Sequence, residues 1–110
     1  MMRLDYAGGT IFTGTAIAHA LLRYAAALAR ADDAVSIKVP GRTTDGVEGD
    51  FQILLGPSSQ ILVEPTDDPD DFVDEEFLAD IEQRIGLLER PPYVLPWDEV
   101  PDFDGPSDQL

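Results

Sequence analysis

The chain has 110 residues, a formal net charge of −15 and no cysteine. This length suits one domain, and the lack of cysteine excludes disulfides, thiol nucleophiles and thiolate metal sites. Residues 1–64 carry seven Asp and Glu against five Lys and Arg, whereas residues 65–110 carry fifteen against two. This charge step argues against binding to nucleic acid or to an anionic membrane, and it favours a partner with a basic surface.

Hydropathy bears on the cellular compartment of the protein. The least polar stretch, residues 16–29, contains His19 and Arg23 and is too short and too polar to span a bilayer. The first dozen residues show no basic start followed by an apolar run, so we expect no signal peptide. These features predict a cytoplasmic protein.

A β-hairpin is predicted at the start of the chain. Apolar and polar residues alternate over residues 2–6, which is the period of a half-buried strand. Gly8 and Gly9 then supply two positions that tolerate positive φ, and the β-prone residues 10–12 follow. A phosphate-binding loop fits less well, because no Gly-Lys-Ser/Thr sequence follows the glycines.

The first helix is predicted over residues 16–30, where nearly every residue is a good helix former. Thr13 or Thr15 can cap its N-terminus by accepting a hydrogen bond from a free backbone amide. Spacings of three and four predict one buried apolar stripe, formed by Ile17, Leu21, Tyr24 and Leu28.

Three strands are predicted next, at residues 35–39, 51–55 and 61–63. Turn sequences separate them at residues 45–46 and 56–59. We interpret this pattern as a three-stranded antiparallel meander. The Pro-Gly pair at residues 40–41 is expected to form a bulge or to end the pairing.

An acidic linker over residues 66–71 leads into a second helix, which Asp71 or Asp74 can cap and which ends before Pro91. The order of hairpin, helix, three strands and helix predicts a two-layer α+β fold with an antiparallel sheet of about five strands. These elements are expected to form a single domain over residues 1–90.

The remaining residues, 91–110, form a tail of different composition. Its five prolines exclude a helix or a central strand over most of its length. Interleaved with acids are the apolar residues predicted to bind a partner, Tyr93, Leu95, Trp97, Val100 and Phe103. For residues 91–97, packing on the chain's own sheet is favoured over docking on a partner or a second copy, because a small domain needs additional core. Residues 101–110 are expected to be disordered.

Few residues suggest chemistry. His19 is the only histidine and falls on the polar side of the first helix, with no Ser or Asp at a triad spacing. The acids of residues 67–71 could offer oxygen ligands to calcium or magnesium, but a solvated acidic run fits their spacing better. The turn at residues 56–60 could present hydroxyls to a ligand, although a turn needs these residue types for its own backbone.

The sequence therefore predicts a small acidic protein without catalytic activity, cofactor or metal, which acts through protein–protein contacts as a homodimer or an accessory subunit. The uncovered sheet face and the tail would be its contact surfaces. The alternative is an acidic inhibitor that offers the carboxylates of residues 67–89 to a basic partner in place of nucleic-acid phosphates. An enzyme or small-ligand binder ranks third.

Overall fold

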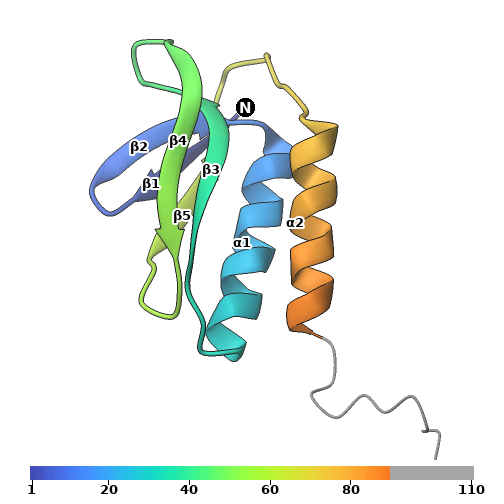
Figure 1. Ribbon diagram of the computed structural model, residues 1–110. Helices are drawn as coiled ribbons and strands as arrows, with labels where there is room; N and C mark the ends of the chain where they lie inside the picture. The colour runs from blue at the N-terminus through green and yellow to red at the C-terminus, as the bar shows by residue number, and fades with distance from the viewer. Residues whose placement is uncertain (90–110) are drawn as a thin grey trace, which may run out of the picture.

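Five antiparallel strands and two helices make up residues 1–89, the part of the chain that the computed structural model describes (Figure 1). The strands are β1 (Met2–Tyr6), β2 (Gly9–Thr13), β3 (Val35–Arg42), β4 (Glu48–Leu55) and β5 (Ile61–Pro65), and the helices are α1 (Thr15–Arg30) and α2 (Glu75–Leu88). The predicted α+β fold with a five-stranded antiparallel sheet is thus confirmed. In this described part, no helix is long and apolar enough to cross a membrane.

The strand order, β4-β3-β2-β1-β5, corrects one part of the prediction. β3 and β4 form the expected hairpin, but β5 pairs with β1 along its whole length, from Met2 opposite Pro65 to Tyr6 opposite Ile61. The last three strands are therefore not a meander. The short connection 56–60 carries the chain from one outer strand of the sheet to the other. A turn sequence shows that the chain changes direction, but it does not show which strand becomes the partner.

The sheet consists of two ribbons, β2-β1-β5 and β3-β4, that meet at a single residue pair, Phe12 opposite Arg42. Beside this pair, the Thr13 hydroxyl donates a hydrogen bond to the Pro40 carbonyl oxygen at 2.7 Å. A Cβ atom on Gly41 would lie 2.9 Å from the Phe12 carbonyl oxygen, so only glycine fits where the ribbons meet.

β3 continues through Pro40, which contradicts the predicted bulge or break. Because Thr13 bonds the Pro40 carbonyl group, the backbone of Pro40 faces β2 rather than β4. The N–H group that proline lacks would therefore have pointed toward β2, which pairs with β3 at a single residue pair. The pairing of β3 with β4 thus loses no hydrogen bond.

The hairpin between β1 and β2 turns one residue earlier than predicted. Tyr6 pairs with Gly9, so the loop consists of Ala7 and Gly8, with φ angles of 50° and 83°. Two successive positive φ angles match the right-handed twist of a two-residue hairpin, and Ala7 adopts one of them although it carries a Cβ atom.

α1 lies against the sheet and buries the predicted stripe of Ile17, Leu21, Tyr24 and Leu28, each at most 3% exposed. The strands contribute the facing core residues Leu4, Ile37, Val39, Ile53 and Leu55. Full burial of one such leucine or isoleucine contributes about 1.5–3 kcal/mol, so this interface supplies most of the apolar stabilisation.

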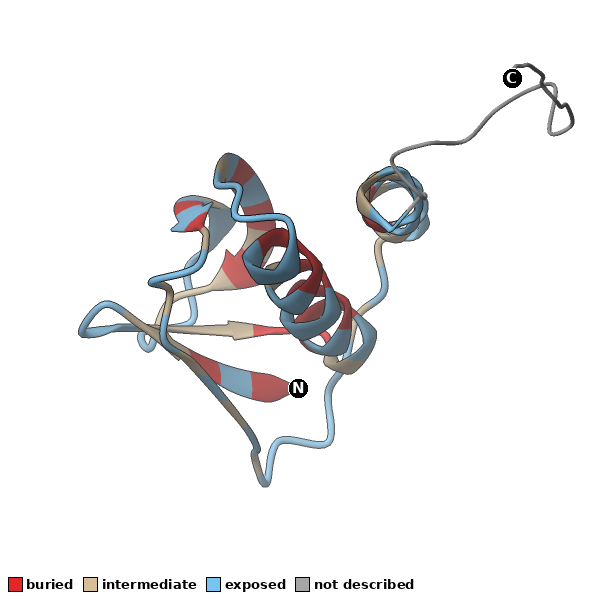
Figure 2. Cartoon of the chain, turned by 90° about the horizontal axis from the view of Figure 1, so that it is seen from below, coloured by how far each residue is buried: buried red, intermediate tan, exposed pale blue. Residues whose placement is uncertain are grey.

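α2 packs against α1, on the side away from the strands, and buries Ile81 and Ile85 (Figure 2). Two ion pairs link the helices, Arg23 with Glu82 and Arg30 with Glu89. Both pairs advance by seven residues on each helix, so the helices run in the same direction. The C-terminal ends of α1 and α2 are therefore neighbours.

The linker 66–74 holds the start of α1. The N-cap residue is Gly14, and the backbone N–H group of Thr15 donates to the Asp71 carboxylate at 2.9 Å. The predicted caps of α1, Thr13 and Thr15, do not cap it. Asp74 caps α2 as predicted and accepts a hydrogen bond from the amide of Phe77 at 3.0 Å.

Candidate functional site

The residues predicted to bind a partner, Tyr93, Leu95, Trp97, Val100 and Phe103, all lie outside the described residues, and so does the segment 101–110 that is expected to be disordered. His19 is exposed on α1, as predicted. Among residues 1–89, no three His, Asp or Glu side chains are grouped to hold a metal ion. In the acidic linker, Asp71 caps α1 and Asp68 accepts a hydrogen bond from the Asp70 amide at 2.9 Å.

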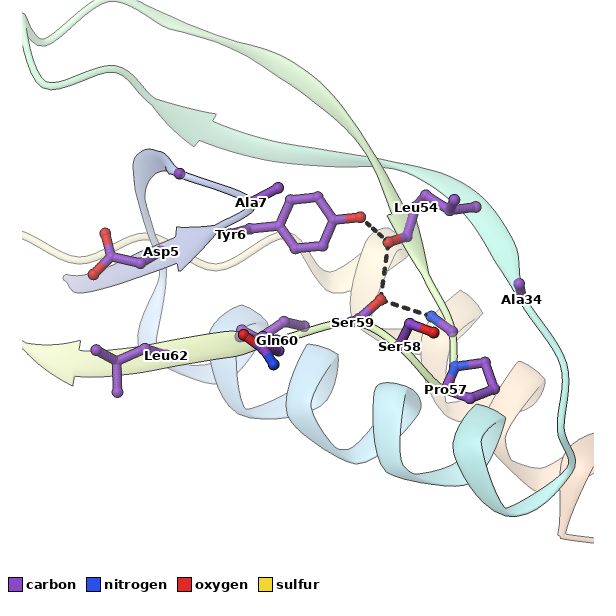
Figure 3. Close-up of a pocket in the computed structure, with 13 residues that line it drawn as sticks. Asp5, Tyr6, Ala7, Ala34, Leu54, Pro57, Ser58, Ser59, Gln60 and Leu62 are labelled. Atoms are coloured by element: carbon purple, nitrogen blue, oxygen red, sulfur yellow. Dashed lines mark hydrogen bonds between the residues drawn. The ribbon is translucent and has the colours of Figure 1, made fainter.

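A pocket of about 910 Å³ lies where the two ribbons of the sheet separate (Figure 3). Its walls come from the end of β1, the hairpin loop, the residue before β3, the end of β4, and the connection into β5. The lining residues are Asp5, Tyr6, Ala7, Gly8, Ala34, Leu54, Gly56, Pro57, Ser58, Ser59, Gln60, Ile61 and Leu62. Its volume is within the range of small-molecule and side-chain binding pockets, and both ribbons contribute to it.

Tyr6 bridges the two ribbons inside this pocket. Its phenolic hydroxyl donates a hydrogen bond from β1 to the Leu54 carbonyl oxygen on β4, as Figure 3 shows. The Ser59 hydroxyl donates to the same oxygen at 3.1 Å and accepts from the Gly56 amide at 2.8 Å. These four residues therefore bond one another and offer little hydrogen-bonding capacity to a ligand.

The one carboxylate in the lining, that of Asp5, is also engaged. The Thr10 hydroxyl donates to it at 2.6 Å, and Arg3 Nε donates at 3.2 Å. The hydrogen bond from Thr10 is the main cause that lowers the pKa of Asp5, and Arg3 adds to it. Asp5 therefore stays ionised at neutral pH, which does not suit it to act as a general acid.

Two leucines form an apolar rim. Leu54 on β4 and Leu62 on β5 are each 57% exposed, whereas Ile53 and Leu55, which flank Leu54, point into the core. Both leucines therefore stand on the face of the sheet that the helices leave uncovered. Exposed large apolar side chains beside a concave surface are typical of a contact site.

A smaller pocket of about 450 Å³ lies beside the β3–β4 hairpin and the linker residue Phe72. Its cation, Arg42, lies 3.6 Å from the carboxylate of Glu48. The positive charge is thus already compensated, and this pocket has no comparable apolar rim.

An acidic surface covers the linker and the outside of α2. Within residues 65–89, ten Asp and Glu accompany one arginine, Arg84. Some of the carboxylates are engaged, as Glu82 is with Arg23, Asp80 with Arg84, and Asp74 with the Phe77 amide in the first turn of α2. Glu75 and Glu76 are exposed in the first turn of α2, where the helix dipole favours negative charge.

The sequence does not predict the pocket as one site. The Gly8 turn and the Ser58 turn are separate candidate ligand sites in the sequence, and the structure places both in the lining of the same pocket. Tyr6 and Leu62 were assigned to strands only. The missing information was the pairing of β5 with β1, because this pairing places Leu62 opposite Asp5, next to Tyr6.

Comparisons of the chain with protein-family models, with curated proteins and with solved structures give no match.

Proposed function

We propose that this protein is a non-catalytic accessory protein that acts through protein–protein contacts, with a second copy or with another protein, and that the pocket between the ribbons is its contact site. The observation that carries this proposal is the pair of leucines, Leu54 and Leu62, each 57% exposed at the rim of a 910 Å³ pocket.

The chemistry of the pocket supports an apolar occupant. The polar groups of Tyr6, Ser59 and Asp5 are bonded within the protein, and the lining residues include no lysine, arginine or histidine. An anion would find no positive charge there, although the hydroxyl of Ser58 and the amide of Gln60 can still hydrogen-bond a polar group. An aromatic or aliphatic side chain of a protein partner would bury apolar surface at about 25 cal/mol per Å².

The test compares two single substitutions on the uncovered face of β4. Leu54→Asp places a charge on the pocket rim, and Gln52→Asp places the same charge two residues away, outside the lining. Each full-length variant is used to capture proteins from extracts of the source cells, and self-association is followed by sedimentation.

The proposal predicts that one partner, or a second copy, binds to the wild type and to Gln52→Asp and binds about tenfold or more weakly to Leu54→Asp. If the two variants bind equally well, or if the wild type binds nothing, the proposal is wrong.

A second candidate function is the acidic inhibitor that binds a basic protein. The excess of ten carboxylates over one arginine in residues 65–89 favours it. In that case, affinity would fall steeply with added salt, and Glu75→Gln with Glu76→Gln would weaken binding more than Leu54→Asp does.

A further inference from the structure

The described chain ends at the same end of the molecule as the pocket. The ion pair of Arg30 with Glu89 holds the end of α2 beside the end of α1, and the chain leaves α1 toward β3 through Ala34, which lines the pocket. Gly56, on the opposite wall, approaches Ala34 so closely that a Cβ atom on it would lie 3.0 Å from the Ala34 Cβ. In Figure 1, the end of α2 and the connection from β4 to β5 lie at the same end of the molecule.

The rest of the chain is long enough to cover this distance. Packed helices are about 8–10 Å apart, so α2 lies roughly 20 Å from the sheet if α1 sits on the strands at a similar spacing. Trp97 follows Glu89 by eight residues, and an extended chain of that length spans about 26–29 Å. Because the leucine rim lies on the far face of the sheet, the path from α2 to the pocket is longer than this. Phe103 follows Glu89 by fourteen residues, so the segment that ends there spans up to about 46–50 Å and can reach the pocket without any change in the described fold.

The composition of this segment fits the pocket. Residues 93–103 carry Tyr93, Leu95, Trp97, Val100 and Phe103, and the pocket offers an apolar rim beside which the hydroxyls of Tyr6 and Ser59 are already bonded. A segment tethered to the same chain has an effective concentration of the order of millimolar, which favours it over the same segment of a second copy at ordinary protein concentrations.

We propose that residues 93–103 of the same chain occupy the pocket and that a protein partner must displace them to bind. This inference rests on the proposed function for the partner, but occupation by the tail can be tested without one. The tail then acts as a built-in competitor, and the apparent affinity for the partner falls by the fraction of time that the pocket is covered.

Trp97 is the only tryptophan, so its fluorescence reports on the tail alone. In the full-length wild type and in Gln52→Asp, we expect emission at short wavelength, typical of a shielded indole. In Leu54→Asp, we expect emission at long wavelength, as in water. The circular dichroism of each variant shows that the domain is folded, and Leu62→Asp replaces Leu54→Asp if the latter unfolds.

If the segment occupies the pocket of its own chain, the emission maximum should not change between dilute and concentrated protein. A water-like spectrum in the wild type, or a shielded spectrum that persists in both rim variants, would overturn the inference. A shift toward short wavelength that appears only at high concentration would also overturn it, in favour of docking on a second copy.

A second variant separates this inference from the proposed function. Once a partner is identified, Trp97→Ala should bind it more tightly, by about tenfold if the tail covers the pocket nine-tenths of the time. Unchanged or weaker binding by Trp97→Ala would refute competition by the tail while leaving the partner site at Leu54 intact. If Leu54→Asp binds the partner as tightly as the wild type does, the proposed function is refuted instead.

Discussion

The hydroxyl of Tyr6 on β1 and the carbonyl oxygen of Leu54 on β4 form a hydrogen bond between strands that are not neighbours in the sheet. In a flat sheet, three strand spacings of about 4.8 Å would separate β1 from β4. One side chain closes this distance because the two ribbons meet only at Phe12 and Arg42 and can fold toward each other. The bond defines one wall of the pocket.

Removal of this hydroxyl should loosen the pocket. We expect Tyr6→Phe to lower the free energy of unfolding by about 1 kcal/mol, the usual contribution of one hydrogen bond. The loss should not exceed this, because the Leu54 carbonyl oxygen still accepts a hydrogen bond from Ser59. Urea denaturation measures this change. An unchanged stability would mean that the bridge does not hold the ribbons together.

The hairpin loop offers a stabilising substitution. Ala7 has a φ angle of 50°, a conformation in which a Cβ atom costs about 1 kcal/mol, so Ala7→Gly should stabilise the protein by about that amount. Ala26→Gly, at an exposed position inside α1, should destabilise it by about 1 kcal/mol. The same chemical change therefore has opposite signs at the two sites, and thermal melts of both variants check this. Destabilisation by Ala7→Gly would contradict the loop conformation.

The contact between the linker and the start of α1 depends on the absence of a side chain. A Cβ atom on Gly14 would lie 2.0 Å from the Phe72 carbonyl oxygen, whereas one on Gly49 would meet nothing within 4 Å. We expect Gly14→Ala to destabilise the fold by about 1–3 kcal/mol or more, because backbone must move, and Gly49→Ala to be nearly neutral. Chemical denaturation of the pair measures the difference. Equal stability of the two variants would show that the linker does not pass over Gly14.

Asp71 should make stability depend on acid pH. Its hydrogen bond from the Thr15 amide is the main cause that lowers its pKa, and the Met1 ammonium group, 3.5 Å away, adds to it. Because the pKa is lower in the folded state, the stabilisation is present above the unfolded value of about 3.9 and is lost as the pH falls through the folded pKa.

Denaturation curves between neutral pH and pH 3 test this prediction. Asp71→Asn keeps an acceptor oxygen but does not titrate, so its stability should fall less with acid than that of the wild type. Asp67→Asn, in the same linker, is the control and should retain the wild-type dependence. Asp5 and Glu82 also have lowered pKa values, so part of the acid dependence should remain in Asp71→Asn. An identical dependence in all three proteins would contradict the prediction.

Local patterns predicted the elements of the fold well. The sequence predicts the stripe that begins at Ile17 because helical spacing is visible within one segment. It offers Asp71 and Asp74 as caps of α2, and the structure uses Asp74, the one next to the helix. The capping of α1 by Asp71 was missed because the two residues are 56 positions apart in the sequence. Nothing in the composition near Thr15 indicates that a distant carboxylate will satisfy its amide.

Contacts between distant segments also explain why the site could not be predicted. The partner of β5 depends on how the sheet folds rather than on the turn at residues 56–60, and the pocket needs β1, β4 and β5 at one place. The sequence also does not show that the side chain of Leu54 is exposed. Leu54 stands in an apolar run, residues 53–55, in which a sequence does not show which residues face outward.

Hydrogen–deuterium exchange of the protein with and without its captured partner tests the central claim most directly. If the pocket is the contact site, the partner should slow exchange at residues 54–62 and at the end of β1, and leave α2 unchanged. If the partner slows exchange only in residues 67–89 and leaves residues 54–62 unaffected, contact through the pocket is wrong and the acidic surface is the binding site.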